Sequence, residues 1–327
     1  MSAGPRILVV RLGSMGDILH ALPAVATLKH SFPASTIAWA VDPKWTALLE
    51  ANPFLDRSIP LERRTLAGLR RAWHDLRAQR FDWAVDFQGL LKSALAASVA
   101  RPDRIYGFHQ SLVREPVAAL FYSNKVRARS AHVVDRNLEL AAATGATSIL
   151  HAFPLPAGSP EGDLPEGGFV LASPLAGWPA KQWPPENYGA LARRLRTEFA
   201  LPLVINGPPI SRDALSGISD VRLHLSGLPG LIHATRAALA VVGIDSGPVH
   251  LAAALGKPGV AVFGPTDPAR NGPYGNTFTV LRSPRAATTY KRREQTDPSM
   301  RDVTPEMVFD ALAARLAGRR RSAGCSA

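Results

Sequence analysis

The feature that most constrains the fold is a repeated alternation of short apolar runs with segments of helical periodicity. The first run, Arg6–Val10, ends at a loop that contains Gly13 and Gly16, and apolar residues then recur at helical spacing over 18–28. Short apolar runs that alternate with helices are typical of parallel sheets covered on both faces. The chain is therefore predicted to be an α/β protein.

The alternation continues along most of the chain. In the first half we predict strands at Thr36–Val41 and 83–87, with helical segments at 45–50 and 90–99. In the second half the predicted strands are 169–172, 203–206, 239–244 and 259–263, and the predicted helices are 187–199, 249–255 and 305–317. Two successive sets of this kind predict two doubly wound units.

The length of 327 residues also favours two domains over one. A stretch rich in proline and glycine, HAFPLPAGSPEGDLPEGG at 151–168, has no apolar periodicity and is interpreted as a linker. We expect an N-terminal Rossmann-like domain over 1–155, a C-terminal one over 169–304, and a closing helix with a basic tail over 305–327, frayed from residue 319. The two domains are expected to face each other across a cleft.

Composition narrows the class of protein. No run approaches the length of a membrane span and no leader pattern precedes the first strand, so a cytoplasmic protein is expected. The single cysteine, Cys325, excludes an intramolecular disulfide and a cysteine-based metal cluster.

The charge is basic and unevenly distributed. The net charge is +12, and 31 of the 38 basic residues are arginine, which suits bidentate recognition of phosphate. Residues 57–129 hold 14 basic and six acidic side chains, a net charge of +8, which predicts an anionic partner there. A solvated basic surface is the alternative. Nucleic-acid binding is a weaker one, because no RNA or DNA module and no paired aromatic stacking pattern is recognisable.

Asp17 lies in the first of three glycine-containing loops at predicted strand ends, RLGSMGD at 11–17. The carboxyl edge of an open parallel sheet is where such folds bind ligands. The loop is neither a dinucleotide fingerprint nor a P-loop, because it lacks the third glycine and the Lys-Ser/Thr pair. Asp17 is interpreted either as a helix cap or as a general base.

The other two loops lie in the second half. LAGWPAKQWP at 175–184 places Lys181 near a helix start, either as a diphosphate contact or within a loop packed by its tryptophans and prolines. The segment 241–268 has two polar strand ends, and backbone N–H groups at its helix start are expected to cradle a phosphate. Its candidate residues are Asp245, Ser246, Gly247, His250, Thr266 and Asp267. A buried, structurally bonded histidine is the alternative for His250.

Four basic residues of the first half are candidates for binding an acidic acceptor. They are Arg63, Arg64, Lys92 and Arg114. Such residues are often plain surface charge, but a polyanionic acceptor needs several of them together.

Six runs in this order and spacing resemble the motifs of the ADP-heptose:lipopolysaccharide heptosyltransferases, glycosyltransferase family 9. They are GSMGDILHALPA, DFQGLLKSAL, REPVAALFYSNK, AKQWPPENY, DSGPVHLAAALGKP and FGPTDPARNGPYG, and the similarity spans residues 6 to about 315. The runs QGLLKS and REPVAALFY look specifically like the heptosyltransferase I branch of this family.

The resemblance implies a GT-B fold and an inverting, metal-independent transfer. The implied donor is ADP-heptose, which carries L-glycero-D-manno-heptose, and the implied acceptor is the Kdo of Kdo₂-lipid A. No cofactor, no nucleic acid and no particular oligomeric state are implied. Peripheral attachment to the cytoplasmic face of the inner membrane is expected.

The resemblance also implies roles for the candidate residues. Asp17 takes the place of the general base, Lys181 faces the donor phosphates, and Asp245 lies near the heptose hydroxyls. Ser246, Gly247, His250, Thr266 and Asp267 belong to the donor loops, and Arg63, Arg64, Lys92 and Arg114 to the acceptor side. The chain departs from the family pattern at 176–177 and 206–213, so a transferase for another nucleotide sugar remains the alternative.

Overall fold

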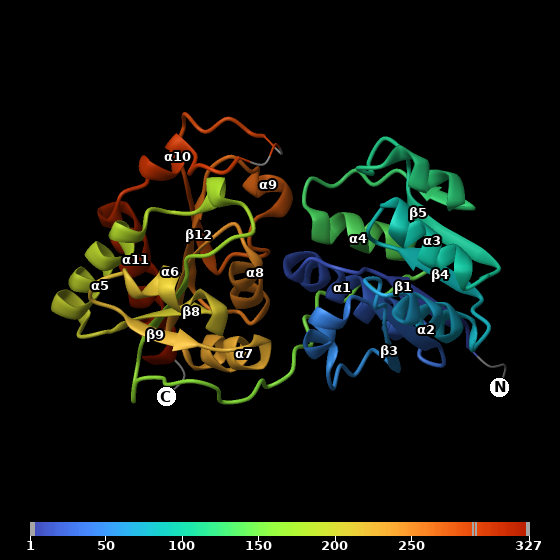
Figure 1. Cartoon of the computed structure of the whole chain (residues 1–327), viewed down its shortest axis with the longest axis horizontal. Helices are drawn as coiled ribbons and strands as arrows, with labels where there is room; N and C mark the ends of the chain where they lie inside the picture. Colours follow the sequence, from blue (N-terminus) through green and yellow to red (C-terminus); the bar gives the residue numbers. More distant parts are fainter. Residues whose placement is uncertain (1–3, 290, 292, 325–327) are drawn as a thin grey trace. The chain divides into compact units, whose positions relative to one another are not determined.

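The computed structural model describes residues 4–289, 291 and 293–324, with the side chains of 318–324 left undescribed. The chain divides into two compact units, unit 1 up to residue 156 and unit 2 from residue 157. Each unit contains one sheet with helices packed on it, in blue to green for unit 1 and in green to red for unit 2 (Figure 1).

The sheet of unit 1 has six parallel strands in the order β3-β2-β1-β4-β5-β6. The strands are β1 (Arg6–Val10), β2 (Thr36–Val41), β3 (Arg57–Pro60), β4 (Trp83–Asp86), β5 (Arg104–Phe108) and β6 (Asn124–Val126). The helices are α1 (Met15–Ser31), α2 (Leu66–Arg77), α3 (Leu91–Val99) and α4 (Val133–Ala142), with 3₁₀ turns η1 (Pro43–Leu49) and η2 (Pro116–Phe121).

The apolar runs form strands because both faces of this sheet are buried. In β1, Leu8 and Val10 pack in a core cluster with Ala72 of α2 and Ala97 of α3. α2 and α3 therefore cover the same face of the sheet. α1 packs against α4, and the right-handed crossover rule places α1 on the opposite face.

The sheet of unit 2 repeats this topology, in the order β12-β11-β10-β7-β8-β9. Its strands are β7 (Val170–Ser173), β8 (Leu203–Gly207), β9 (Arg222–Leu225), β10 (Ala240–Ile244), β11 (Gly259–Phe263) and β12 (Phe278–Arg282). Its helices are α5 (Pro185–Phe199), α6 (Arg212–Ser216), α7 (Leu228–Ala237), α8 (Gly247–Ala254), α9 (Pro268–Asn271), α10 (Pro298–Arg301) and α11 (Pro305–Gly324), with 3₁₀ turns η3 (Pro179–Lys181) and η4 (Pro209–Ser211).

The expected fold class, two doubly wound α/β units as in GT-B proteins, is confirmed. One prediction at the C-terminal end was wrong. The tail expected to fray from residue 319 continues α11 to Gly324, while 325–327 lie outside the described residues. Val308, Phe309 and Leu312 anchor the start of α11 in the core of unit 2, and the alanines and arginines that follow are good helix formers.

Both sheets have a point where the strand order reverses. In unit 1 the reversal lies between β1 and β4, and in unit 2 between β7 and β10. Loops at the carboxyl ends of two such strands diverge and leave a crevice, which is where open α/β sheets bind ligands. We call these the unit 1 and unit 2 switch points. Within the described residues, no helix has the length and apolar character needed to cross a bilayer.

Candidate active site at the two switch points

The unit 2 switch point joins a lysine and an aspartate that are 64 residues apart in sequence. Lys181 follows β7 and Asp245 follows β10, and Lys181 Nζ donates to Asp245 Oδ2 at 2.5 Å. Both side chains are largely buried, with 16% and 8% of their surfaces exposed. The reversal of strand order therefore produces a buried ion pair at the carboxyl edge.

Asp245 has further donors beside its carboxylate. Thr266, after β11, donates its hydroxyl to Asp245 Oδ2 at 2.6 Å, and His250 Nε2 lies 3.6 Å from Oδ1. Burial by itself raises the pKa of Asp245, but the hydrogen bond from His250 and the charges of Lys181 and His250 together lower that pKa well below its ordinary value. Asp245 is thus held as a carboxylate that neutralises Lys181 and orients three side chains.

The start of α8 supplies groups that a phosphate can use. Ser246 is the N-cap and Gly247 the first helical residue, so the Gly247 N–H has no acceptor one turn back in the helix. Pro248 has no N–H, and the Val249 N–H donates to the Ser246 carbonyl at 3.2 Å. Among the described residues, nothing hydrogen-bonds to the buried hydroxyls of Ser246 or of Ser173, the last residue of β7. Since β7 and β10 are adjacent, these two unbonded hydroxyls and the Gly247 N–H lie at the same edge of the sheet as Lys181.

Close packing positions α8 against β10. Gly243 lies in β10, and a Cβ atom there would collide with the Val249 side chain of α8. The glycine therefore lets the helix start approach the strand end that carries Asp245.

The loop that carries Lys181 is anchored in the core of unit 2. The Trp183 ring is buried, donates to the Val303 carbonyl at 2.7 Å, and meets the Tyr188 ring edge-on at a centroid distance of 4.9 Å. Lys181 Nζ also lies 4.5 Å from the centroid of the Trp178 ring. This loop holds the ammonium group in one place.

Thr266 and Asp267 have different surroundings, although both follow β11. Thr266 is buried and bonded to Asp245, whereas Asp267 is the N-cap of α9 and accepts from the Ala269 N–H at 3.0 Å. The structure therefore brings Lys181, Asp245, His250 and Thr266 together, and gives Asp267 a capping contact.

The unit 1 switch point also carries an aspartate beside a cation. Asp17 lies in the first turn of α1, and its Oδ2 accepts from the backbone N–H of Ser14 at 2.8 Å and from its hydroxyl at 3.0 Å. Its Oδ1 pairs with Arg11 Nη2 at 2.5 Å. Asp17 therefore caps the helix, which was the first of the two roles considered for it, and 39% of its side chain is exposed. A capping role and a role as base are compatible here.

Arg11 and Gln88 tie the two loops of the unit 1 switch point together. Arg11 is buried and donates through Nη1 to the carbonyl of Phe87, the residue after β4. Gln88 Oε1 accepts from the Leu12 N–H at 2.7 Å. The orientation of Asp17 therefore depends on the loop that follows β4.

That loop is built around a buried carboxylate, Asp86. It accepts from the N–H groups of Gln88 and Gly89 at 2.8 and 3.3 Å, and from the hydroxyl of Tyr122 at 2.7 Å. Burial raises the pKa of Asp86, an effect that the hydrogen bonds oppose. Asp86 fixes the turn through which Gln88 and Phe87 reach β1.

The four basic candidates all follow the carboxyl ends of strands in unit 1. Arg63 follows β3 and pairs with Asp42, which follows β2, at 3.2 Å. Arg64, Lys92 and Arg114 are exposed, and the described side chains give them no ion pair. Because parallel strands end at one edge, these residues lie on the side of the sheet that carries Asp17.

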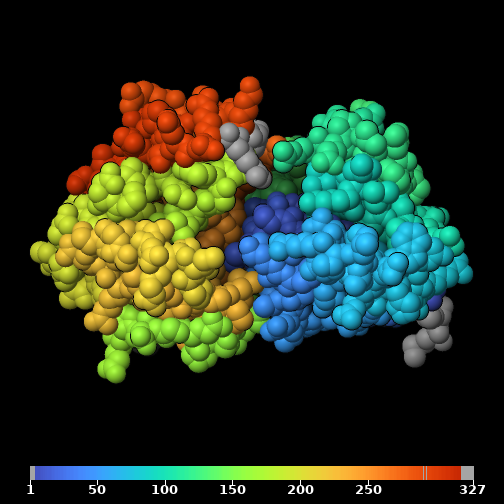
Figure 2. All heavy atoms as spheres, in the orientation of Figure 1, coloured from blue at the N-terminus to red at the C-terminus, as the bar shows by residue number. Residues whose placement is uncertain are grey.

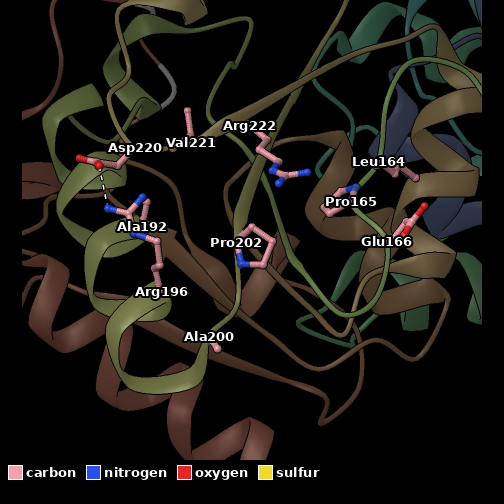
Figure 3. Close-up of a pocket in the computed structure, with 10 residues that line it drawn as sticks. All are labelled: Leu164, Pro165, Glu166, Ala192, Arg196, Ala200, Pro202, Asp220, Val221 and Arg222. Atoms are coloured by element: carbon pink, nitrogen blue, oxygen red, sulfur yellow. Dashed lines mark hydrogen bonds and ion pairs between the residues drawn. The ribbon is translucent and has the colours of Figure 1, made fainter.

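A surface pocket elsewhere is not part of this arrangement. Figure 3 shows it with Arg196 and Asp220 on one side and the 164–166 segment on the other. It lies at the amino ends of β8 and β9, and Arg196 donates to Asp220 at 2.9 Å. It therefore lies at the edge of the sheet opposite the unit 2 switch point. In the described part of the chain, no three His, Cys, Asp or Glu side chains gather in a way that could hold a metal ion.

Arg11, Asp86, Gln88 and Ser173 were not predicted as site residues from the sequence. Arg11 lies in the 11–17 loop, and Asp86 and Gln88 lie in the DFQGLLKSAL run, so polar residues at the ends of strands were the available signal. Ser173 gave no signal, because its place at the site comes from the pairing of β7 with β10.

Comparison with known proteins gives three findings. The family model described as glycosyltransferase family 9 (heptosyltransferase) matches residues 69–301. Lipopolysaccharide heptosyltransferase 1 of Escherichia coli K12 is 29% identical over 86% of this chain and 94% of its own length, and lipopolysaccharide heptosyltransferase 2 of Salmonella typhimurium is 28% identical over 94% and 97%. The solved structure of the E. coli heptosyltransferase WaaC with ADP is 26% identical, has a TM-score of 0.77, and covers 95% of this chain and 99% of that one.

Proposed function

Because the chain belongs to glycosyltransferase family 9, the heptosyltransferases, we propose that it transfers L-glycero-D-manno-heptose from ADP-heptose to a Kdo residue of the lipopolysaccharide inner core. It is a glycosyltransferase, and the matching relatives act in lipopolysaccharide synthesis by their names. The finer assignment, a heptosyltransferase I with a Kdo₂-lipid A acceptor, rests on the QGLLKS and REPVAALFY runs.

The observation that carries the proposal is the cluster at the unit 2 switch point. Lys181 bonds Asp245, the residue before the N-cap of α8, and so lies near the Gly247 N–H and the Ser246 hydroxyl, a combination suited to a diphosphate. A related structure contains ADP and another contains ADP-2-deoxy-2-fluoro heptose, both in an enzyme that covers almost all of this chain. We assign the donor to unit 2, through Lys181, Asp245, Ser246, Gly247, His250 and Thr266, with Asp267 capping the adjacent turn.

The proposed reaction inverts the anomeric centre. An acceptor hydroxyl oxygen forms a bond to the anomeric carbon while the bond from that carbon to the diphosphate breaks, and the electron pair leaves with ADP. The proton of the hydroxyl passes to the Asp17 carboxylate. Lys181 and the start of α8 stabilise the charge that develops on the leaving diphosphate.

Asp17 suits the role of base because it is both held and accessible. Arg11 and Ser14 fix its two oxygens, while more than a third of the side chain faces solvent. A positioned base of this kind typically contributes about 10²-fold to 10⁴-fold in rate. We assign the acceptor to the carboxyl edge of unit 1, where Arg63, Arg64, Lys92 and Arg114 offer charge to phosphates and Kdo carboxylates.

The test is to incubate the purified protein with ADP-heptose and Kdo₂-lipid A and weigh the lipid product by mass spectrometry. The proposal expects one heptose added, and expects none when the acceptor already carries its first heptose. Addition only to the heptosylated acceptor would assign the second transfer instead. Turnover with another nucleotide sugar and not with ADP-heptose would favour the alternative donor, which the departures at 176–177 and 206–213 leave open.

A further inference from the structure

Helix α2 turns apolar side chains toward solvent. Leu66, Leu69 and Trp73 follow one another at helical spacing on one face of the helix, and Leu66 and Trp73 are 76% and 53% exposed. The adjoining face, with Ala72 and Leu76, packs on the sheet. A surface helix normally points polar residues toward solvent, so this exposed apolar stripe indicates a surface that another molecule covers.

The neighbouring elements extend the stripe. Leu91 and Leu95 are exposed on α3, one helical turn apart, and Val117 and Leu120 are exposed on η2, with Leu120 at 76%. α3 lies beside both α2 and η2, and α2 and α3 cover the same face of the sheet. We call Leu66, Leu69, Trp73, Leu91, Leu95, Val117 and Leu120 the apolar face of unit 1.

The clustering is strong. Seven of the eleven large apolar side chains that are exposed among the described residues belong to this face. The light-blue and teal parts of unit 1, to which α2, α3 and η2 belong, adjoin on the visible surface in Figure 2. Scattered apolar residues need no explanation, but seven gathered on three adjacent elements indicate an interaction surface.

Basic side chains lie on and beside the elements that form the apolar face. Arg70, Arg71 and Arg77 are exposed on α2, and the Arg77 guanidinium lies 5.3 Å from the centroid of the Trp73 ring. Lys92 is exposed on α3, and Arg114 precedes η2. Leucine, tryptophan and arginine on one helix face are the combination that binds at the headgroup level of anionic bilayers.

We propose that the apolar face of unit 1 docks the protein on an anionic lipid bilayer. The apolar side chains enter the boundary between headgroups and acyl chains, and the arginines contact lipid phosphates. The advantage of such docking for catalysis rests on the proposed function, in which the acceptor is a lipid embedded in the bilayer. Lys92 and Arg114 lie both next to the apolar face and at the carboxyl edge that carries Asp17, so docking brings that edge to the acceptor.

The test measures sedimentation with vesicles that contain no acceptor, so the result does not depend on transferase activity. Vesicles of phosphatidylcholine are compared with vesicles that also contain phosphatidylglycerol. The wild-type protein is expected to bind the anionic vesicles, and less so as salt rises. The double variant L66S/W73S is expected to bind about tenfold or more weakly, from the apolar area withdrawn from the bilayer.

The matched control is Ile210→Ser, which removes an apolar side chain that is 93% exposed in unit 2. It should bind vesicles like the wild type, and thermal melting should show all variants folded. A wild-type protein that ignores anionic vesicles, or equal losses in L66S/W73S and Ile210→Ser, would overturn the proposal. If the wild type does not bind vesicles but forms a concentration-dependent dimer, and L66S/W73S does not form it, the apolar face binds a second copy of the chain instead.

Discussion

Asp17 and Asp245 occupy corresponding places in the two units, each at the switch point of a six-stranded sheet and each beside a cation, yet their environments differ. Asp245 is 8% exposed, and Lys181, Thr266 and His250 occupy its surroundings. Asp17 is 39% exposed; its Oδ1 pairs with Arg11 and its Oδ2 accepts from Ser14. The same topology therefore yields one enclosed carboxylate and one that is open to solvent.

The difference separates two kinds of work. A carboxylate with a strongly lowered pKa, surrounded by donors, is a poor proton acceptor, but it holds Lys181 in place, and in the proposed function that lysine binds a diphosphate. An accessible carboxylate whose orientation is fixed can accept a proton from a bound hydroxyl. On this account unit 2 stabilises the leaving group and unit 1 activates the nucleophile.

Asp17→Asn tests the unit 1 half of the comparison and has the largest expected effect. Asp17 is the third helical residue of a capping box, and the side-chain oxygen of asparagine can still accept from the Ser14 N–H, but asparagine cannot take the acceptor's proton. Steady-state kinetics should show turnover reduced by about 10²-fold to 10⁴-fold, with a melting temperature within a few degrees of wild type. The control Asp213→Asn, in the first turn of α6, should keep its turnover. If Asp17→Asn also kept most of it, the carboxylate would be only a cap, and His20 and Asp245 would be the next candidates for the base.

Lys181→Ala tests the unit 2 half. Without the ammonium group the leaving diphosphate loses its main cationic partner at this edge, and kcat at saturating donor should fall by at least about 10²-fold. Lys125→Ala, on the edge strand β6 of unit 1, serves as the control and should leave kcat unchanged. Near wild-type kcat in Lys181→Ala would remove this residue from the donor site.

Acid sensitivity should distinguish Asp245 from an exposed carboxylate. A carboxyl whose pKa is lowered in the folded state stabilises the fold above its unfolded pKa, and that stabilisation disappears as the pH falls through the folded value. Asp245→Asn should lower the free energy of unfolding by about 2 kcal/mol at pH 7, and the gap to wild type should narrow below about pH 4. Denaturant unfolding at several pH values measures this. Asp310→Asn, at an exposed position, should show no comparable gap, and a gap for Asp245→Asn that stays constant with pH would contradict the assignment.

The basic candidates of unit 1 should give the smallest effect. Lys92→Ala and Arg114→Ala each remove one exposed charge, so the acceptor KM should rise by about threefold to tenfold while the donor KM stays constant. Added salt should act in the same direction. Arg104→Ala is the control, because Arg104 is exposed at the amino end of β5 and thus at the opposite edge of the sheet. Equal changes in all three variants would mean that these arginines and lysines act only as general surface charge.

Much of the fold could be predicted because buried strands leave a clear pattern. β1, β2 and β11 have the predicted bounds, since continuous apolar runs bordered by glycine or polar residues define both ends. The edge strands β3, β6, β9 and β12 were missed, because each has few buried residues and pairs on one side only, so periodicity carries little signal there. The inner strand β5 was also missed, and its first two residues are not buried.

The site was predictable in part for a similar reason. Polar residues directly after buried strands, such as Asp245 and Thr266, stand out in sequence, and the structure brings these two together. The contacts of Gln88 with Leu12 and of Arg11 with Phe87 join segments 76 residues apart. Only the placement of β4 beside β1 creates them, and no local pattern encodes that pairing.

The division of labour between the two switch points is tested most directly by ADP binding, measured by isothermal titration calorimetry in the wild type, Asp17→Asn and Lys181→Ala. Asp17→Asn should bind ADP as the wild type does, although its turnover is strongly reduced. Lys181→Ala should bind ADP at least about tenfold more weakly, because a charge-assisted contact to phosphate is removed. Weak ADP binding in Asp17→Asn together with wild-type binding in Lys181→Ala would contradict the account.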